Sequence, residues 1–551
     1  MPNELRLSVH DRPVMLNLMK REEYDLVIIG GGINGAGVAR DAASRGMKVA
    51  VIEAEDFAIG TSSRSSKLIH GGIRYLENYE FHLVFEALSE RALLFEIAPN
   101  LVHPLRFVLP LYKGNRVGMF LMGLGMWAYD ALSLFEAPEP HERLSAEESC
   151  RRLPLLQPKG LQGSYVYSDA YMDDDRLVHE TFRSAVALGA RVANRVRAKD
   201  VVMKDGKIAA VVAHDSKSGT NFEIRGKHFV STVGPWTDRV ATDLLKDWKK
   251  ILRPSKGVHL TFKRSRFDVK DAIVMAADDD KRIVFGIPRH EMYIIGTTDT
   301  DFTGDPKDVS VTPEDVRYLL EVASHYFPGA KLTKEDIIAS YAGVRPLVDD
   351  GSATESKTSR EHVVLNDPRN ITFVAGGKYT TYRRMALDTV ESTLDYFGIE
   401  DRVRFGRSGT EAPLNKLASV EALTSARQSI DRYVRESGLE RDEISLLVER
   451  HAMEIEALLA RDPGPPLSSK ERMWVMEAKH AIRETMCDSL VDFYSRRVPL
   501  FLSQRDHGLG YLNRISRAFQ EELGWTESER VAACQALQEY IRNELAWRDS
   551  V

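Results

Sequence analysis

The sequence predicts an α/β fold followed by an all-helical domain, and three observations carry this prediction. An apolar run at residues 24–30 leads into a glycine-rich, helix-spaced segment and then into a second apolar run at 47–53. Short strand-like runs broken by a few helices dominate residues 160–380. Past about residue 408 the strand signals fade and long helical patterns take over, so we expect a helical domain over residues 408–551.

The first elements form one strand–helix–strand unit. Residues 24–30 are apolar and β-branched, as in a buried parallel strand, and the helix-spaced segment after them ends at Gly46. Residues 47–53 form the second buried strand. An amphipathic helix from roughly 81 to 97 follows, with Pro99 shortly after its end.

Two helix starts in the C-terminal part are marked by capping boxes. Ser468 with Glu471, and Thr526 with Glu529, have the S/T-x-x-E spacing in which each end satisfies the other's free amide. The last helix carries a stripe at three- and four-residue spacing that we interpret as a core face: Val531, Cys534, Leu537, Ile541 and Leu545.

Composition excludes several classes of protein. The chain has 551 residues, of which 43% are hydrophobic and 28% charged, as in an ordinary soluble globular protein. Lys and Arg total 75 against 81 Asp and Glu, and this net charge of -6 gives no electrostatic footprint for nucleic acid. Cys150, Cys487 and Cys534 lie far apart without CxxC spacing, so we expect neither a disulfide framework nor a zinc site, and a reducing, cytoplasmic compartment.

No membrane-spanning helix is predicted. The N-terminal residues mix acids and bases and do not form a signal peptide. The charge-free run at residues 117–129 is well short of the ~20 residues that a spanning helix needs. We expect this run to form a buried helix, while peripheral contact with a membrane surface stays open.

A dinucleotide-binding turn follows the first strand. Gly30, Gly32 and Gly35 form G-x-G-x-x-G between a strand and a helix, which is the context that makes this pattern specific. Gly30 allows the tight turn, Gly32 lets the backbone reach a diphosphate, and Gly35 lets helix and strand pack closely. Glu53, at the end of the second strand, is placed to accept hydrogen bonds from a ribose and would repel a 2′-phosphate. NAD and FAD therefore remain, and NADP is disfavoured.

The loop after the second strand is rich in serine and glycine. Residues 61–77 read TSSRSSKLIHGGIRYLE and carry Lys67, His70 and Arg74. The pair Gly71–Gly72 before a helix start suggests backbone lying against a planar ring. Such a loop suits an extended dinucleotide with a second ring system.

Seven motifs in one order make a specific resemblance. GGGINGAGVARDAASRG and SSRSSKLIHGGIRYLE are followed by STVGPW, SKGVHL, GTTDTD, YAGVRPL and FVAGGKYTTYRRMA. Over residues 24–400 the chain resembles the FAD-dependent glycerol-3-phosphate dehydrogenases of the aerobic, bacterial type. The resemblance implies the D-amino-acid-oxidase-like flavoprotein fold: a Rossmann-type, discontinuous FAD-binding domain within residues 1–407, interleaved with a mainly antiparallel substrate-binding sheet from roughly 100–165 and 250–350. The tail at 408–551 resembles that family's helical domain.

The resemblance implies FAD as the cofactor. Gly376 and Gly377 follow an apolar strand and open a helix whose free amides would face the anionic pyrimidine end of a reduced flavin, and Lys378 would add a positive charge there. The expected cofactor-binding residues are Gly30, Gly32, Gly35, Glu53, Ser62, Ser63, Ser66, Lys67, His70, Gly71, Gly72, Gly234, Gly376, Gly377, Lys378 and Thr380.

The substrate implied by the family is glycerol 3-phosphate. A nearly dianionic phosphate is held best by the planar, bidentate donors of arginine. Arg345 follows an apolar strand and precedes Pro346, so its side chain projects from a fixed place. The expected substrate-binding residues are Arg74, Arg345, Arg360 and Lys378.

Oxidation of the alcohol by hydride transfer to flavin N5 requires a base for the hydroxyl proton, and histidine is the first candidate. His259 alternates with apolar neighbours on a probable strand, and His70 lies closer to the expected flavin ring. The expected catalytic residues are His259, Arg345, Lys378 and His70.

The resemblance implies that electrons pass to a membrane quinone, from an enzyme that contacts the inner face of the cell membrane and that is compatible with a homodimer. An oxidase that uses oxygen is the nearest alternative. An amino-acid oxidase, which would need a carboxylate clamp, and a non-catalytic FAD-binding scaffold are less favoured.

No metal site is predicted. Residues 173–175 and 278–280 are Asp triplets that lack the spacing and the glycine of a calcium-binding EF-hand loop. We expect both to be solvated carboxylates or helix-start carboxylates. Signatures of zinc proteases, serine hydrolases and P-loop enzymes are also absent from the sequence.

Overall fold

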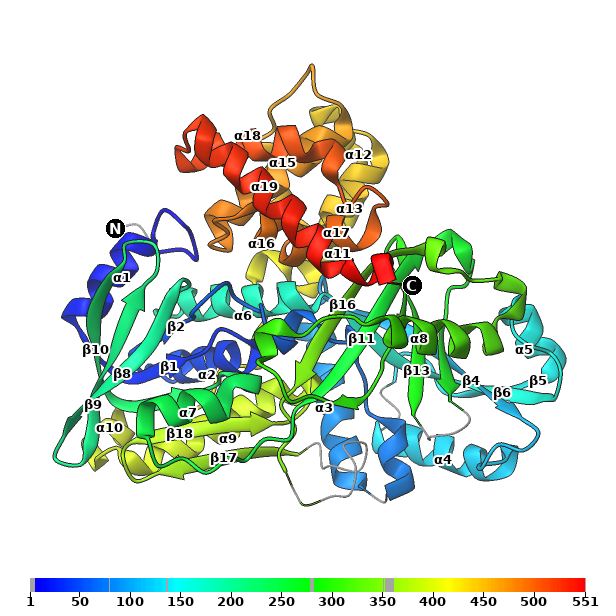
Figure 1. The fold of residues 1–551 in the computed structure, drawn as a ribbon, viewed down its shortest axis with the longest axis horizontal. Coiled ribbons are helices and arrows are strands. Elements are labelled where there is room, and N and C mark those ends of the chain that lie inside the picture. Colours follow the sequence, from blue (N-terminus) through cyan, green and yellow to red (C-terminus); the bar gives the residue numbers. More distant parts are fainter. Residues whose placement is uncertain are drawn as a thin grey trace.

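The computed structural model describes residues 5–78, 80–134, 137–277, 282–349, 351 and 361–550. Two β-sheets with flanking helices make up the first part of the chain, and the C-terminal helices lie over them (Figure 1). This arrangement confirms the predicted fold class.

The first sheet contains the predicted strand–helix–strand unit. Its central strand β1 pairs in parallel with β2 on one side and β10 on the other, and β18 pairs in parallel with β10. The order is β17-β18-β10-β1-β2-β7, with β9 joined to β10 and β8 to β9. Neighbouring strands of this sheet therefore come from distant parts of the chain. The strands are β1 (Glu23–Ile29), β2 (Val49–Ile52), β7 (Arg191–Ala193), β8 (Val196–Lys204), β9 (Lys207–Asp215), β10 (Thr220–Ser231), β17 (His362–Asp367) and β18 (Ile371–Gly376).

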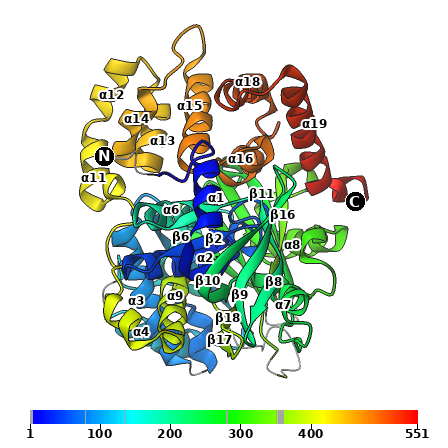
Figure 2. The ribbon, with the colours of Figure 1, turned by 90° about the vertical axis from the view of Figure 1, so that its left-hand side faces the viewer.

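Helices bury the faces of the first sheet. Strand β1 is buried over all but its first residue, as its β-branched sequence predicts. Helix α2 (Ile33–Ser44) packs between α6 (Asp174–Ala187) and α9 (Tyr382–Thr393). Beside the strands lie α1 (Arg12–Arg21) and α7 (Thr237–Leu245) (Figure 2). Helix α10 (Ile399–Arg404) follows α9 along the chain.

The second sheet is mainly antiparallel. Its order is β15-β11-β14-β13-β12-β4-β6-β3, with β16 joined to β11 and β5 joined to β6. Among the described strands of this sheet, β12 with β4 is the only parallel pair. Helix α8 (Pro313–Tyr326) packs on this sheet. The strands are β3 (Leu68–Ile69), β4 (Val102–Tyr112), β5 (Glu142–Ser145), β6 (Leu161–Met172), β11 (Ser255–Lys263), β12 (Ala272–Ala276), β13 (Ile283–Arg289), β14 (Met292–Gly296), β15 (Thr300–Asp301) and β16 (Ile337–Arg345).

The charge-free run at 117–129 forms a surface helix, so the expectation that it is buried is wrong. Helix α4 (Met119–Leu132) packs one side on β6 and on α3 (Phe81–Ile97), at the end of the molecule away from the helical domain (Figure 1). Its other side faces solvent: Phe120 is 81% exposed and Trp127 is 62% exposed. In the described part of the chain no helix is long and apolar enough to span a membrane.

The Asp triplet at 173–175 starts a helix, as expected, but Asp173 and Asp174 are buried and not solvated. Asp173 precedes α6 and is buried with Arg289, whose Nη2 lies 2.6 Å from its carboxylate. Burial alone would raise the pKa of Asp173, but the charges of Arg289 and His290 hold it well below its usual range. Asp174 is buried against Lys67. Residues 278–280 lie outside the described residues.

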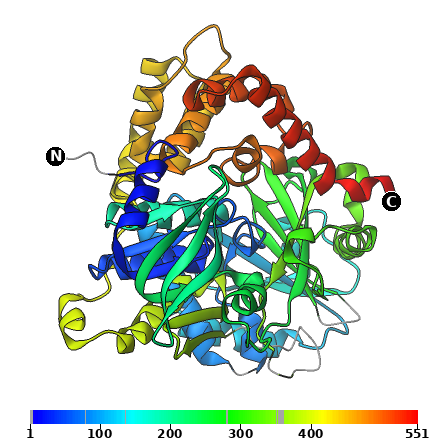
Figure 3. The same cartoon turned by 60° about the vertical axis from the view of Figure 1, so that its left-hand side comes forward.

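The C-terminal domain spans across both sheets (Figure 3). Both predicted capping boxes are present, at the starts of α15 and α19. The stripe on α19 is buried at Leu537, Ile541 and Leu545, but Val531 is 42% exposed because the helix extends beyond the core at that end. The helices are α11 (Val420–Gln428), α12 (Ile430–Ser437), α13 (Arg441–His451), α14 (Ile455–Leu459), α15 (Ser469–Glu484), α16 (Leu490–Arg496), α17 (Leu500–Ser503), α18 (Leu512–Leu523) and α19 (Glu527–Glu544). Helix α5 (Ala146–Arg152) packs against β5 and β6 of the second sheet.

Candidate active site

A cavity of about 1430 Å³ runs between the two sheets. Single small-molecule pockets typically enclose about 300–1,000 Å³, so this cavity has room for an extended ligand and a small substrate together. Its wall includes the carboxyl ends of β1, β2 and β10, and parts of β11 and β16 from the second sheet.

The glycine turn at one end of the cavity leaves space that a side chain would fill. Gly30 has φ +118°, and a Cβ there would lie 2.7 Å from the carbonyl oxygen of Thr232. A Cβ on Gly35 would collide with the carbonyl oxygen of Gly30, so the predicted close packing of α2 on β1 needs glycine. Gly32 caps the start of α2 and lines the cavity. This backbone cradle at a helix start fits a diphosphate.

Glu53 stands beside this turn, at the end of β2. Its Oε2 accepts a hydrogen bond from Gly31 N (2.6 Å) and its Oε1 accepts one from Glu55 N (2.8 Å). Burial raises the pKa of Glu53, and these two N–H groups counteract that rise. The fixed carboxylate on the wall is chemically suited to a ribose diol.

The serine-rich loop reaches the cavity at some of the predicted residues and not at others. Ser62, Ser66, His70 and Gly72 line the cavity; Ser63, Lys67 and Gly71 do not. Lys67 is only 1% exposed, and its Nζ lies 2.5 Å from Asp174 and donates to Ser63 O at 3.1 Å. Lys67 therefore stabilises the serine-rich loop on the side away from the cavity.

Gly71 is enclosed by side chains. A Cβ there would collide with the Tyr129 hydroxyl of α4, so Gly71 packs against that helix. The backbone of Arg74 lies in the 3₁₀ helix η2 (Ile73–Asn78). Its side chain, like the whole of Arg360, lies outside the described residues.

A second glycine turn follows β18. Gly376 and Gly377 have φ of +71° and +83°, and a Cβ on Gly376 would lie 2.6 Å from Glu361 O. Both line the cavity with Lys378 and Thr380, and Gly234 (φ +56°) lines it after β10. His70 N donates to Thr380 Oγ1 at 3.2 Å, which joins this turn to the serine-rich loop.

Lys378 lies over an aromatic ring at the cavity wall. Its Nζ is 3.6 Å from the centroid of Tyr75, which also lines the cavity. The ring face favours the cation and holds it at one place on the wall.

Arg345, the last residue of β16, is held on the wall by the neighbouring strand ends. Its Nη2 donates to Thr297 Oγ1 (2.8 Å) and its Nη1 to Asp299 Oδ1 (3.1 Å). A Cβ on Gly257 would collide with this guanidinium, so glycine on β11 makes room for it. Arg345 is thus a fixed, partly exposed cation that forms an ion pair with Asp299.

His259 lies on the cavity side of β11, while Val258 and Leu260 enter the core behind it. Its Nε2 and Ser66 Oγ share a hydrogen bond at 2.9 Å, and its ring stacks on Tyr341 with centroids 4.8 Å apart. No described residue hydrogen-bonds Nδ1. Burial, with the charges of Arg345 and Lys67, lowers the pKa of His259 well below its usual range, so the imidazole is neutral near pH 7.

Sequence reasoning missed several residues of the wall. Thr297 and Asp299 belong to the GTTDTD motif, so their sequence signal was present, but the pairing with Arg345 depends on the sheet. Tyr540, Asn543 and Glu544 come from α19 and line the cavity without any motif that predicts it.

The fold and the cavity define a class of protein, the FAD-dependent oxidoreductases. The family model "FAD dependent oxidoreductase" matches residues 25–383, and the model "C-terminal domain of alpha-glycerophosphate oxidase" matches residues 419–530. The glycine cradle, the Glu53 carboxylate and the volume of the cavity all fit FAD, which is the cofactor.

Named relatives are similar over nearly the whole chain. The aerobic glycerol-3-phosphate dehydrogenase of Staphylococcus haemolyticus is 32% identical over 96% of both chains, and that of Bacillus subtilis is 33% identical over 95% of this chain and 96% of its own. The solved structure of the glycerol-3-phosphate dehydrogenase from Bacillus halodurans complexed with FAD has a TM-score of 0.80 at 28% identity, covering 97% of this chain and 98% of the other. The chain belongs to the family of the aerobic glycerol-3-phosphate dehydrogenases.

Proposed function

We propose that the protein oxidises sn-glycerol 3-phosphate to dihydroxyacetone phosphate and passes the electrons to a membrane quinone. The observation that carries this proposal is that one cavity contains the dinucleotide cradle together with Arg345 of β16, His259 of β11 and Lys378 of the turn after β18. The names of the relatives support the same substrate.

Arg345 is the proposed holder of the phosphate. FAD, when bound, supplies the acceptor for the hydride that leaves C2 of the alcohol. The guanidinium is fixed by Thr297 and Asp299 before any ligand arrives, so little side-chain entropy is lost on binding. A phosphate competes with Asp299 for Nη1, and its second negative charge favours the phosphate.

His259 is the proposed acceptor of the hydroxyl proton. A neutral imidazole has a lone pair available, and stacking on Tyr341 fixes the ring. Although burial and nearby cations lower the pKa of the free site, an anionic substrate beside the ring would raise it toward neutrality. Lys378 on the Tyr75 ring would place positive charge near the same end of the cavity.

The exposed apolar face of α4 supports a membrane-bound acceptor. This face presents Phe120, Leu121, Leu124 and Trp127, and Phe85 of α3 is 41% exposed nearby. The 3₁₀ helix η2 packs against both α3 and α4, while its Ile73 and Tyr75 line the cavity. The short helix η2 therefore separates the part of the cavity proposed to hold the flavin ring from an apolar surface that suits a lipid interface.

Anaerobic visible absorbance is the first test of the reaction. We expect the flavin band of the purified protein to bleach when glycerol 3-phosphate is added and to persist with glycine or proline as controls. A band that persists with glycerol 3-phosphate contradicts the substrate proposal and leaves FAD binding intact. Recovery of the band with a soluble quinone but slowly with oxygen supports the dehydrogenase; rapid recovery with oxygen identifies an oxidase.

Flotation with lipid vesicles tests the membrane contact. The double variant Phe120→Ser/Trp127→Ser removes two large exposed side chains without touching the cavity, so vesicle binding should fall about ten-fold or more. Val531→Ser, at an exposed apolar residue of α19, is the control. Equal flotation of all three proteins contradicts the role of α4.

A further inference from the structure

The helical domain contacts two loops that also form the wall of the cofactor cavity. The first loop, residues 53–56, begins with Glu53, and the second carries Arg64 after the 3₁₀ helix η1 (Thr61–Ser63). Glu53 and Arg64 both line the cavity. In each loop a charged side chain has its partner on or beside a helix of the C-terminal domain.

At the first contact, Asp56 is fully buried and is bound by two arginines at the C-terminal end of α16. Arg497 donates to both of its carboxylate oxygens, with Nη1 and Nη2 each at 2.8 Å. Arg496 donates from Nε to Asp56 Oδ2 at 2.8 Å. The bidentate pair fixes the position and the orientation of the carboxylate.

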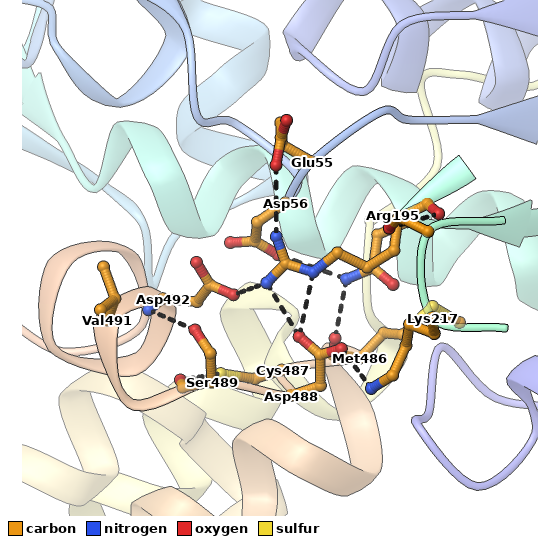
Figure 4. A network of polar contacts seen from close by, with 12 residues as sticks. Glu55, Asp56, Arg195, Lys217, Met486, Cys487, Asp488, Ser489, Val491 and Asp492 are labelled. Atoms are coloured by element: carbon orange, nitrogen blue, oxygen red, sulfur yellow. Dashed lines mark hydrogen bonds and ion pairs between the residues drawn. The ribbon is translucent and has the colours of Figure 1, made fainter. Parts of the chain in front are cut away.

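Arg195 extends the same contact along the neighbouring chain segment. Figure 4 shows its guanidinium between Glu55 and two carboxylates of the helical domain, Asp488 and Asp492. Lys217 lies 2.6 Å from the other oxygen of Asp488. The backbone N–H of Arg195 donates to Glu55 O at 2.9 Å, so this network holds the loop as well.

These contacts are transmitted to Glu53 through the backbone. Glu55 N donates to the Glu53 carboxylate at 2.8 Å, and Val196 N donates to Glu53 O at 2.7 Å. A shift of Asp56 or of Arg195 therefore moves the carboxylate proposed to hold the ribose.

At the second contact, α19 holds Arg64. The two nitrogens Nη2 and Nη1 donate to Glu544 at 2.6 and 3.4 Å, and Nη1 also donates to Ala342 O at 3.1 Å. Glu544 itself lines the cavity. This second contact lies beside β16 of the second sheet, whereas the first lies at the loop after β2 of the first sheet. The helical domain therefore contacts the cavity wall on both sheets.

We propose that the helical domain clamps the bound FAD, with Arg497 and Glu544 as positioning residues that act through the loops of Glu53 and Arg64. Removing one partner of a buried ion pair leaves the other charge less well compensated. Without Arg497, Asp56 keeps its bond from Arg496 but loses the bidentate pair, and without Glu544, Arg64 loses its carboxylate partner. Here that charge stands on a cofactor loop, so loosening either contact weakens cofactor retention before it unfolds the protein.

The test uses Arg497→Gln and Glu544→Gln in the full-length holoenzyme. After dilution, FAD release is followed by ultrafiltration and absorbance, without substrate, so that the result is independent of the proposed reaction. We expect release about ten-fold faster in each variant and a smaller FAD-induced rise in the melting temperature. Asp462→Asn is the matched control, because Arg472 donates to both carboxylate oxygens of Asp462 in a similarly buried pair that lies inside the helical domain and outside the cavity wall.

The control should release FAD at the wild-type rate. Wild-type release from both variants, or loss of melting temperature that is equal with and without FAD, overturns the proposal and leaves a purely structural role. Glu544→Gln decides the question alone if Arg497→Gln does not fold, since Arg64 keeps its bond to Ala342 O. Arg497→Lys, which keeps the charge but not the bidentate pair, should recover part of the retention.

Discussion

The two ends of the cavity differ in whether backbone atoms or side chains form the wall. At the dinucleotide end the wall is mostly backbone, with Gly30 and Gly32 beside the start of α2. At the other end it is made of charged and aromatic side chains on antiparallel strands, among them Arg345 and His259. A side chain at Gly30 would collide with the carbonyl oxygen of Thr232, so the backbone wall cannot accept one there, whereas a substitution in the side-chain wall removes a single functional group.

Gly35→Ala should have the largest effect. Its added methyl would meet the carbonyl oxygen of Gly30, so α2 must move away from β1, with a loss of about 3 kcal/mol in stability and of bound FAD. Flavin absorbance per chain and thermal unfolding measure both. The control Gly125→Ala on α4 has open space around it and should keep its flavin. If the Gly35→Ala protein kept its full complement of flavin, the claim that the backbone at this turn leaves no room for a side chain would be wrong.

Arg345→Ala should remove turnover and spare the cofactor. Losing the fixed guanidinium should lower kcat/KM for glycerol 3-phosphate about a hundred-fold or more, while bound FAD is unchanged. Arg253→Ala is the control, since Arg253 pairs with Asp301 on the same sheet outside the cavity wall. A colourless Arg345→Ala protein would place this residue in the cofactor site instead.

His259→Asn should separate proton transfer from binding. We expect kcat to fall about 10²–10⁴-fold with little change in bound FAD, and the acidic limb of the pH profile to change, because the proposed base is gone. Steady-state rates across pH check this. Wild-type kcat in the variant would exclude His259 as the base.

His228, on β10, packs against Tyr396 and Phe397 outside the cavity wall and should affect stability alone. Burial lowers its pKa to about 3, and its Nε2 shares a hydrogen bond with Thr372 Oγ1. The unfolded chain takes up the proton near pH 6.5 and the folded chain near pH 3, so the stability contributed by the neutral ring is lost as pH falls through this window. His228→Gln should reduce that loss by up to about 1.4 kcal/mol per pH unit in urea unfolding; an unchanged slope would contradict it.

Sequence patterns predicted correctly those features that depend on a few neighbouring residues. The glycine turn at Gly30, the helix at 81–97 and the capping box of Ser468 each depend on a few neighbouring residues, and each lies where the sequence places it. The exposure of α4 and the burial of Lys67 against Asp174 depend on what packs beside them. No pattern within α19 could indicate that Glu544 reaches the cavity, because its partner Arg64 lies in a distant segment.

The parallel pairing of β1 with β10 has a consequence for the order of events on the ribosome. Leu26 of β1 pairs with His228, and β18, which completes the parallel core, ends at Gly376. Pairings between such distant segments form late, since the chain between them must first be made and closed into a loop. Nascent chains shorter than this should therefore take up no flavin, and colour should appear only after most of the protein has been synthesised.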